Sequence, residues 1–232
     1  MKLGKDYSRG IEWRLSSWKS NQDPVPGEFI YEANTQGYPQ FELKDRGVVK
    51  HRSGPWKIER FGGISFSNMI LTFMINVVVT KNEVSYAYHI ENNTSILSRL
   101  TLNASGNLVA TVWQEQSKNW QVVFSYPRDI CDGYSNCGGY GSCSAANMVT
   151  KSCACLDQYR FVPKDDDLSG GCVRRTPLAC KNGLEAFIND LIDIRVIPVS
   201  GRDIFVKVAS SEIGNSFLLG FAWRIDAIMV KR

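Results

Sequence analysis

The chain has little histidine and no cysteine pairs of the kind that usually hold zinc. His51 and His89 are its only histidines, and neither C-x2-C nor C-x4-C occurs. Zinc fingers usually present such pairs, often with histidine, and thioredoxin-like redox sites need C-x-x-C. We therefore predict no metal site, no cofactor and no thiol-redox centre.

Long apolar runs are also missing. No stretch reaches the roughly 20 apolar residues that a membrane helix needs; residues 69–79 come nearest but are too few and include Asn76. The N-terminus, Met-Lys-Leu-Gly-Lys-Asp, lacks the apolar core of a secretory signal peptide. We expect neither a membrane span nor a signal peptide in this sequence.

The sequence shows no strong charge bias. The net charge is +4 and the basic residues are scattered. A nucleic-acid surface needs a clustered basic stripe, so we expect no nucleic-acid partner. The acidic run at 165–167 could form a metal or acid cluster, but charge runs usually solvate loops, and we interpret it as a solvated loop.

Cysteine is what the chain does have, and it is concentrated. Six of the seven cysteines lie within residues 131–172, spaced C-x5-C-x5-C-x9-C-x1-C-x16-C. Glycine and small polar residues fill the gaps, so apolar burial cannot offset the chain entropy and cross-links are needed. The even count and the tight C-x-C favour disulfides, with zinc as the weaker alternative; spacing alone does not choose the pairing.

Three glycosylation sequons agree with the oxidising compartment in which disulfides persist. They begin at Asn92, Asn93 and Asn103. The first two overlap, so we expect only one of that pair to be glycosylated.

Residues 1–130 have the pattern of β-structure. Short β-branched or aromatic runs, each bounded by Asn, Ser, Gly or Lys, occur at 71–79, 84–90, 96–102, 108–113 and 120–125. Composition predicts turns at 23–27, 34–37 and 45–47. Regular strand and turn signals predict an all-β sandwich, prism or barrel. Five of the six tryptophans lie in this half; we expect them to fill its core, with a sugar-binding aromatic platform as the alternative.

The C-terminal part is less regular. Residues 184–192 have the apolar spacing of a helix, residues 203–208 look like a strand, and residues 216–232 show no clear period.

Seven phrases together resemble the ectodomain of plant S-locus glycoproteins and S-domain (G-type lectin) receptor-like kinases, over the chain to about residue 211. They are Leu-Ser-Ser-Trp-Lys-Ser (15–20), Asp-Pro-Val-Pro-Gly-Glu-Phe (23–29), Arg-Ser-Gly-Pro-Trp (52–56), Leu-Ser-Arg-Leu-Thr-Leu (97–102), Cys-Asp-Gly-Tyr-Ser-Asn-Cys-Gly-Gly-Tyr-Gly-Ser-Cys (131–143), Gly-Gly-Cys-Val-Arg-Arg-Thr-Pro-Leu-Ala-Cys (170–180) and Asp-Leu-Ile-Asp-Ile-Arg (190–195).

The resemblance implies a mainly β chain in several parts. A lectin-like β-prism or sandwich, the S-locus glycoprotein domain, would occupy residues 1–130. A small EGF-like module would follow at 131–172, an incomplete PAN/apple segment at 173–211, and a tail whose order the sequence does not indicate at 212–232. The family's signal peptide, first lectin domain and most of the PAN core would be missing, and the helical spacing at 184–192 would then reflect the shortened PAN segment.

The EGF-like resemblance also implies a disulfide pairing: Cys131 with Cys143, Cys137 with Cys153, and Cys155 with Cys172. Cys180 resembles the first PAN cysteine but has no later partner, so it would be a free or intermolecular thiol. We expect no calcium, because only Asp129 and Asp132 flank the first cysteine.

No catalytic signature is found. The kinase motifs, a Gly-rich loop, Val-Ala-Ile-Lys, His-Arg-Asp and Asp-Phe-Gly, do not occur. A Cys–His pair would need Cys180 beside His51 or His89, and no pattern places them together. We therefore predict that this chain is not an enzyme.

The resemblance implies instead an extracellular or cell-surface recognition fragment of the pollen-recognition, self-incompatibility type. Family ectodomains bind small secreted cysteine-rich proteins and dimerise. Their variable stretches correspond to residues 58–85 here, which gives the candidate ligand contacts Arg60, Phe61, Phe66, Met69 and Phe73. Alternatively, Phe66, Met69 and Phe73 fill the core. The chain could also be a lectin-like module that binds glycans, or the non-functional product of a truncated receptor-kinase gene.

Overall fold

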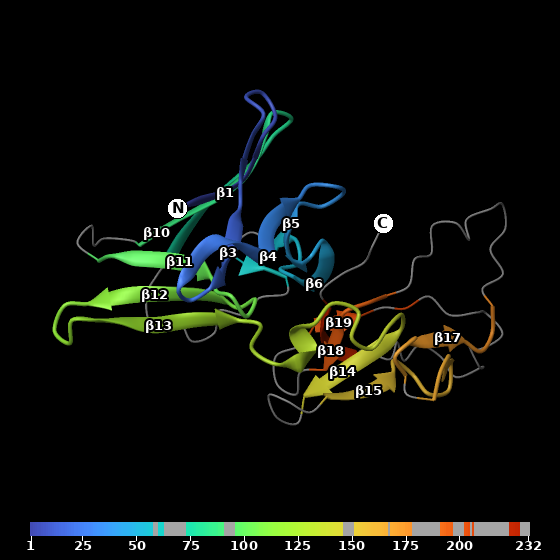
Figure 1. Cartoon of the computed structure of the whole chain (residues 1–232). Coiled ribbons are helices and arrows are strands. Elements are labelled where there is room, and N and C mark those ends of the chain that lie inside the picture. The colour runs from blue at the N-terminus through green and yellow to red at the C-terminus, as the bar shows by residue number, and fades with distance from the viewer. Residues whose placement is uncertain are drawn as a thin grey trace. The chain divides into compact units, whose positions relative to one another are not determined.

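The computed structural model describes residues 1–57, 60–62, 73–90, 96–145, 151–166, 168–177, 191–196, 202–204, 206 and 223–227. The described part is mainly β-structure and divides into two compact units, residues 1–128 and 129–232 (Figure 1). Among the described residues, no helix is long and apolar enough to span a membrane.

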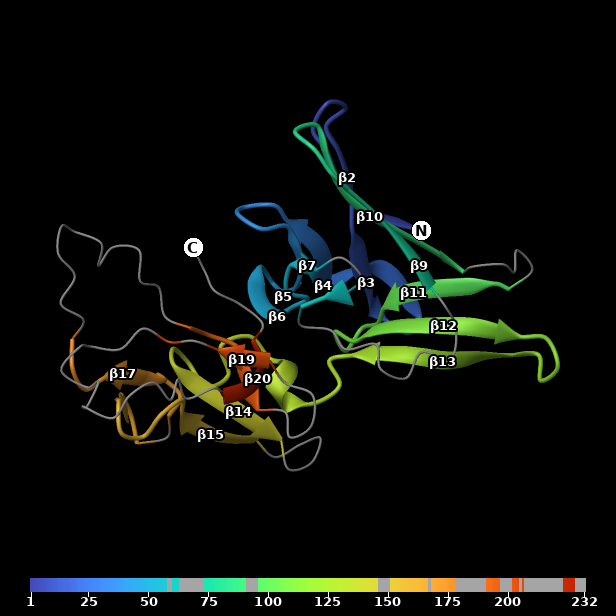
Figure 2. The same ribbon diagram turned by 180° about the vertical axis from the view of Figure 1, so that it is seen from behind.

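The first unit is built from antiparallel strands. They are β1 (Lys2–Asp6), β2 (Ile11–Trp13), β3 (Leu15–Ser20), β4 (Asp23–Asn34), β5 (Gln40–Asp45), β6 (Val48–Arg52), β7 (Trp56–Lys57), β8 (Arg60–Phe61), β9 (Phe73–Val79), β10 (Glu83–Ile90), β11 (Ser98–Leu102), β12 (Leu108–Gln114) and β13 (Asn119–Tyr126). Three larger sheets have the orders β2-β1-β10-β9, β3-β4-β5-β6 and β11-β12-β13, and β7 pairs with β8. Figures 1 and 2 show that the β1–β2 and β9–β10 turns lie together at the tip of a projecting arm.

One hydrophobic core serves all three larger sheets. It contains side chains from β1 and β10, from β4 and β5, and from β11, β12 and β13. At its centre the Phe41 ring lies 5.0 Å from Tyr31, 5.6 Å from Phe61 and 4.9 Å from Tyr86, between centroids. Burying such a side chain stabilises the fold by about 1.5–3 kcal/mol. Three sheets contribute to this core, in agreement with the predicted mainly β, lectin-like fold.

Local sequence accounts for most of these strands. In β5, Phe41 and Leu43 face the core while Gln40 and Lys44 alternate to the other face, as a strand period of two requires. The β5–β6 hairpin turns at Arg46 and Gly47, with φ of 48° and 82°, and glycine adopts such angles without steric cost. The mainly β prediction is confirmed, including strands at 84–90, 108–113 and 120–125.

The turn predicted at 23–27 is wrong, because β4 begins at Asp23 and the chain turns at residues 21–22. The two prolines are tolerated because proline, which has no amide hydrogen to donate, is accepted at strand edges and bulges. Residues 23–28 of β4 pair with β3 but not with β5, and the β3–β4 register is irregular. Gly27 is needed in that ladder, because a Cβ atom would lie 2.4 Å from the Trp18 carbonyl oxygen.

The tryptophans do not fill the core, contrary to our expectation. Only Trp56 packs against it, while Trp18 is 54% exposed. Trp13, Trp113 and Trp120 are half-buried outside the core cluster. The core is filled instead by tyrosine, phenylalanine and leucine, and the indoles occupy outer strand positions, where cross-strand contacts stabilise them.

The second unit begins with the 3-10 helix η1 (Ile130–Asp132). Its strands are β14 (Gly141–Ala145), β15 (Lys151–Cys155), β16 (Phe161–Pro163), β17 (Cys172–Arg174), β18 (Ile194–Val196), β19 (Arg202–Ile204) and β20 (Trp223–Ala227). One sheet has the order β15-β14-β18-β20-β19, with β14 and β18 parallel. Tyr140, Leu156, Phe161, Cys172 and Ile194 form its core.

This sheet joins segments that the sequence assigned to separate parts. Strands β14 and β15 lie in the cysteine segment, β18 and β19 in the PAN-like segment, and β20 in the tail. The cysteine segment is therefore paired with the C-terminal strands rather than isolated from them. The helical spacing at 184–192 and Cys180 lie largely or wholly outside the described residues.

Candidate functional site

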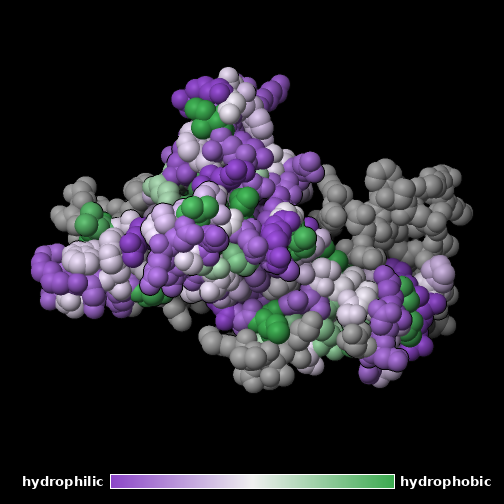
Figure 3. Space-filling view, in the orientation of Figure 1, coloured by the Kyte–Doolittle hydropathy of each residue, from purple (hydrophilic) through white to green (hydrophobic). Residues whose placement is uncertain are grey.

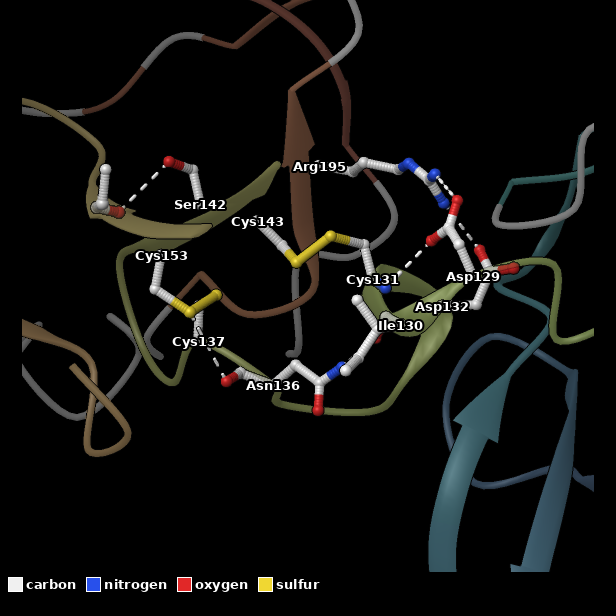
Figure 4. Close-up of a disulfide and its surroundings, with 11 residues drawn as sticks. Asp129, Ile130, Cys131, Asp132, Asn136, Cys137, Ser142, Cys143, Cys153 and Arg195 are labelled. Atoms are coloured by element: carbon white, nitrogen blue, oxygen red, sulfur yellow. Dashed lines mark hydrogen bonds and ion pairs between the residues drawn. A yellow bond between two sulfur atoms is a disulfide. The ribbon is translucent and has the colours of Figure 1, made fainter. Parts of the chain in front are cut away.

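Three disulfides hold the cysteine segment. Cys131–Cys143 joins η1 to β14. Cys137–Cys153 joins the loop between η1 and β14 to β15, and Cys155–Cys172 joins β15 to β17. Their Cα separations are 5.7, 5.5 and 5.8 Å, within the usual range of about 4.4–6.8 Å. These are the pairs that the EGF-like resemblance implies, and Figure 4 shows the first two. With their sulfurs bonded to each other, these cysteines cannot act as thiolate ligands for zinc.

Two glycine segments are in contact beside the third disulfide. Gly139 and Gly171 form a parallel bridge, and the Cys172 amide donates to the Gly139 carbonyl oxygen at 2.7 Å. A Cβ atom on Gly171 would lie 2.4 Å from the Gly139 nitrogen, closer than real contacts allow. A Cβ atom on Gly138 would likewise lie 2.4 Å from the Gly171 nitrogen. Glycine at 138 and 171 therefore lets the two backbones approach where Cys172 bonds to Cys155.

The Arg195 side chain, from β18, forms ion pairs with two carboxylates at the start of the cysteine segment (Figure 4). Its Nη1 donates to Asp132 Oδ1 at 2.9 Å and its Nη2 donates to Asp129 Oδ2. Asp129 also caps η1, since its Oδ1 accepts from the Cys131 amide at 2.9 Å. The Asp132 side chain is 1% exposed and that of Arg195 17%, so the guanidinium compensates charge that burial would otherwise make costly.

The two carboxylates that flank Cys131 are thus engaged by an arginine. Nearby, the Ser135 amide donates to Asp193 Oδ1, a second link between this segment and the chain just before β18. The described residues contain no cluster of three or more His, Cys, Asp or Glu side chains that could hold a metal ion. Sequence reasoning missed Arg195, because no local pattern relates it to Asp129 and Asp132.

The predicted ligand contacts are only partly described. Phe61 is 8% exposed and packs against Trp56 and Phe41 in the core, so it cannot present its ring to a ligand and that assignment is corrected. Arg60 lies in β8 and Phe73 in β9. Phe66 and Met69 lie outside the described residues.

The third sequon lies in the turn between β11 and β12. Asn103 Oδ1 accepts from the backbone amides of Ser105 at 3.0 Å and Asn107 at 2.8 Å. Its exposure is intermediate, and glycosylation at Asn103 stays a prediction. Asn92 and Asn93 lie outside the described residues.

Both histidines lie in strands of the first unit. His51, in β6, lies edge-on to Tyr126 with ring centroids 5.6 Å apart. His89 lies in β10 opposite Met74 of β9. The nucleophile that a cysteine–histidine site would need, Cys180, lies outside the described residues.

Comparison with known proteins points to one family. Residues 51–165 match the model of the S-locus glycoprotein domain. The receptor-like serine/threonine-protein kinase SD1-7 of Arabidopsis thaliana is 35% identical over 191 residues, which is 81% of this chain and 22% of that protein. The matched stretch of the family model begins within β6 and ends after β16, so it includes most of the cysteine segment.

Two relatives named as S-locus-specific glycoproteins are also similar. Glycoprotein S6 of Brassica oleracea is 34% identical over 213 residues, covering 89% of this chain and 48% of that protein. Glycoprotein BS29-2 of Brassica oleracea var. alboglabra is 37% identical over 187 residues, covering 78% and 42%. The chain thus spans less than half the length of these glycoproteins and about a fifth of the length of the kinase.

Proposed function

This chain is a relative of the plant S-locus glycoproteins and S-domain receptor-like kinases, and from that premise we propose that it is a non-catalytic recognition module for a protein ligand outside the cell. The similarity to two S-locus glycoproteins, over 78% and 89% of the chain, carries the proposal. Disulfides support the location, because they persist in oxidising compartments.

The proposed ligand is a small secreted cysteine-rich protein, as the family resemblance implies. Its contact surface would include residues from the stretch 58–85, and we retain Arg60, Phe66, Met69 and Phe73 as candidates. The kinase activity that the name of one relative carries would belong to a part of that protein outside the similar region.

Binding to a panel of small secreted cysteine-rich proteins tests this function. The chain would be produced through a secretory route, checked for its three disulfides and immobilised for biolayer interferometry. We expect at least one panel member to bind, and Arg60→Glu to weaken that binding about tenfold or more, because charged contacts at an interface strongly affect affinity.

Arg46→Glu is the matched control. The Arg46 side chain is 70% exposed in the β5–β6 turn, so the same charge reversal there should leave binding within about twofold, as is usual for surface changes away from an interface. Failure of every panel member to bind the folded protein would contradict the proposal. Equal effects of the two substitutions would remove Arg60 from the contact surface.

A further inference from the structure

The outer face of sheet β11-β12-β13 has a composition unusual for a solvent-facing surface. The opposite face carries Leu102, Leu108 and Val112 into the core. The outer face, which we call the tryptophan face, presents two aligned rows of side chains. They are Leu97, Trp113 and Trp120 in one row, and Arg99, Thr111 and Val122 in the other. Leu97 is 60% and Val122 57% exposed, so apolar groups border both rows.

Arg99 is held flat on this face. Its guanidinium carbon lies 4.2 Å from the Trp120 ring centroid, and its Nε donates to Thr111 Oγ1 at 3.2 Å. Trp113 contacts Trp120 edge-on, with centroids 5.6 Å apart. These contacts fix the plane of the guanidinium and occupy its Nε. Its two terminal nitrogens have no hydrogen-bond or ion-pair partner among the residues that the structure describes.

A guanidinium with both terminal nitrogens open matches the two oxygens of a carboxylate in a bidentate pair. The nearest carboxylate on the β12–β13 hairpin is already used, because Glu115 accepts from Trp113 Nε1 at 2.8 Å and pairs with Lys118. The ligand that complements this face therefore carries its own carboxylate next to an apolar surface that can lie against an indole.

The size of the face favours a small ligand over a protein. Strands lie about 4.8 Å apart and alternate residues about 7 Å apart, so the two rows cover roughly 10 by 7 Å between Cα atoms. A stable protein interface buries about 800 Å² on each partner. In the surface seen in Figure 3, hydrophobic residues of the described chain form small separate spots rather than one broad area.

We propose that the tryptophan face binds an acidic oligosaccharide through a uronic acid residue, whose carboxylate pairs with the terminal nitrogens of Arg99. The C–H face of the sugar ring would lie against Trp113, since indoles bind apolar surface in a fixed geometry. Asn103 lies at the opposite end of β12 from Trp113, so a glycan there would not cover the indoles. This inference does not depend on the protein-ligand proposal, and either can fail alone.

Calorimetric titration of the intact, disulfide-bonded chain with a galacturonic acid trimer tests this site. We expect binding that weakens with salt, and a loss of about tenfold or more in Arg99→Gln, because hydrogen bonds to charged groups are strong. Arg99→Lys should also lose affinity, since lysine keeps the charge but lacks the planar guanidinium that donates two parallel hydrogen bonds to a carboxylate. Arg46→Gln removes the same charge from an exposed site on another sheet and should bind like the parent.

Three further probes decide what is bound. The methyl-esterified trimer and a neutral mannose trimer should not bind, because neither carries a carboxylate. A hexaglutamate peptide should bind more weakly than the galacturonic acid trimer, because it has no sugar ring to place on Trp113. The proposal is overturned if the folded parent does not bind the acidic trimer, if Arg99→Gln and Arg46→Gln bind alike, if either neutral sugar binds equally, or if the peptide binds as tightly.

Discussion

Arg195 shows how much one side chain can contribute to this molecule. It reaches from β18 to two carboxylates at the start of the cysteine segment, 66 residues away in sequence from the farther one. Asp132 is almost fully enclosed there, and a buried carboxylate without its cation is strongly destabilising. The link therefore ties the C-terminal strands to the disulfide-bonded segment independently of any sulfur.

Removing that guanidinium should loosen the second unit. We predict that Arg195→Gln lowers its unfolding free energy by about 3–5 kcal/mol, the usual loss on breaking a buried ion pair. Hydrogen-exchange mass spectrometry should show faster exchange in peptides covering residues 129–145. Arg175→Gln is the control, because the Arg175 side chain is exposed and donates to a carbonyl oxygen, that of Gln158, rather than to a buried carboxylate. If both variants exchange like the parent, Arg195 does not stabilise the segment.

At the scale of elements, the contact between residues 138–139 and 170–171 controls whether β17 reaches the rest of the unit. Gly171 combines a φ of 80° with a neighbour 2.4 Å from where a Cβ would lie. Either condition favours glycine, and the second excludes any side chain unless the backbone moves.

We predict that Gly171→Ala prevents complete formation of Cys155–Cys172. Free thiols, counted by maleimide labelling of the denatured protein, should exceed those of the parent. Gly37→Ala is the control that separates backbone strain from steric collision, because Gly37 has the same φ of 80° but no atom within 4 Å of where a Cβ would lie. It should lower the unfolding free energy by about 1–2 kcal/mol, the penalty for a left-handed residue. It should leave all three disulfides formed. Native thiol counts in Gly171→Ala would show that the close approach is not required.

The strands were predictable where local signals were strong. Segments such as 84–90 and 108–113 have β-branched and aromatic side chains bounded by turn residues, so their conformation follows from nearby sequence. Strand β1 was not predicted: Lys-Leu-Gly-Lys-Asp has a weak pattern, and it is a strand because it pairs with β10 some 80 residues later. The pairing of β18 with β14 and β20 was missed for the same reason.

In the candidate sites, too, some features could be predicted from the sequence and others depend on contacts between distant segments. The cysteine pairing was available from the family resemblance and not from spacing. The stacking of Arg99 on Trp120 depends on the register of three strands, which the sequence does not show. We expected the tryptophans in the core because tryptophan is buried on average, and that expectation was wrong because the strand register places Trp113 and Trp120 on the outer face.

For the whole molecule, the two units should respond differently to alkali. All seven cysteines lie in the second unit and five of the six tryptophans in the first, so tryptophan fluorescence mainly reports the unit that disulfide exchange cannot affect. Two core tyrosines of that unit, Tyr31 and Tyr86, are 4% and 6% exposed. Burial raises the pKa of Tyr86 to about 12, and burial, with Tyr86 nearby, raises the pKa of Tyr31 further.

These shifts predict that the first unit loses stability as the pH rises above about 10, the pKa of tyrosine in an unfolded chain. Above that pH the unfolded state releases a proton that the folded state keeps, so the stabilisation is complete below pH 10 and declines toward pH 12. Urea titrations followed by tryptophan fluorescence from pH 8 to 11 should show the decline. It should be shallower in Tyr86→Phe and unchanged in Tyr159→Phe, whose side chain is 80% exposed in the other unit. A urea midpoint independent of pH would contradict this.

The most direct test of the whole account is a map of the cysteine bonds in the secreted, folded chain, made by mass spectrometry of peptides cleaved without reduction. We expect peptides linked as Cys131–Cys143, Cys137–Cys153 and Cys155–Cys172, with Cys180 outside these three bonds. Six free thiols in folded protein, or stoichiometric zinc bound to them, would contradict it.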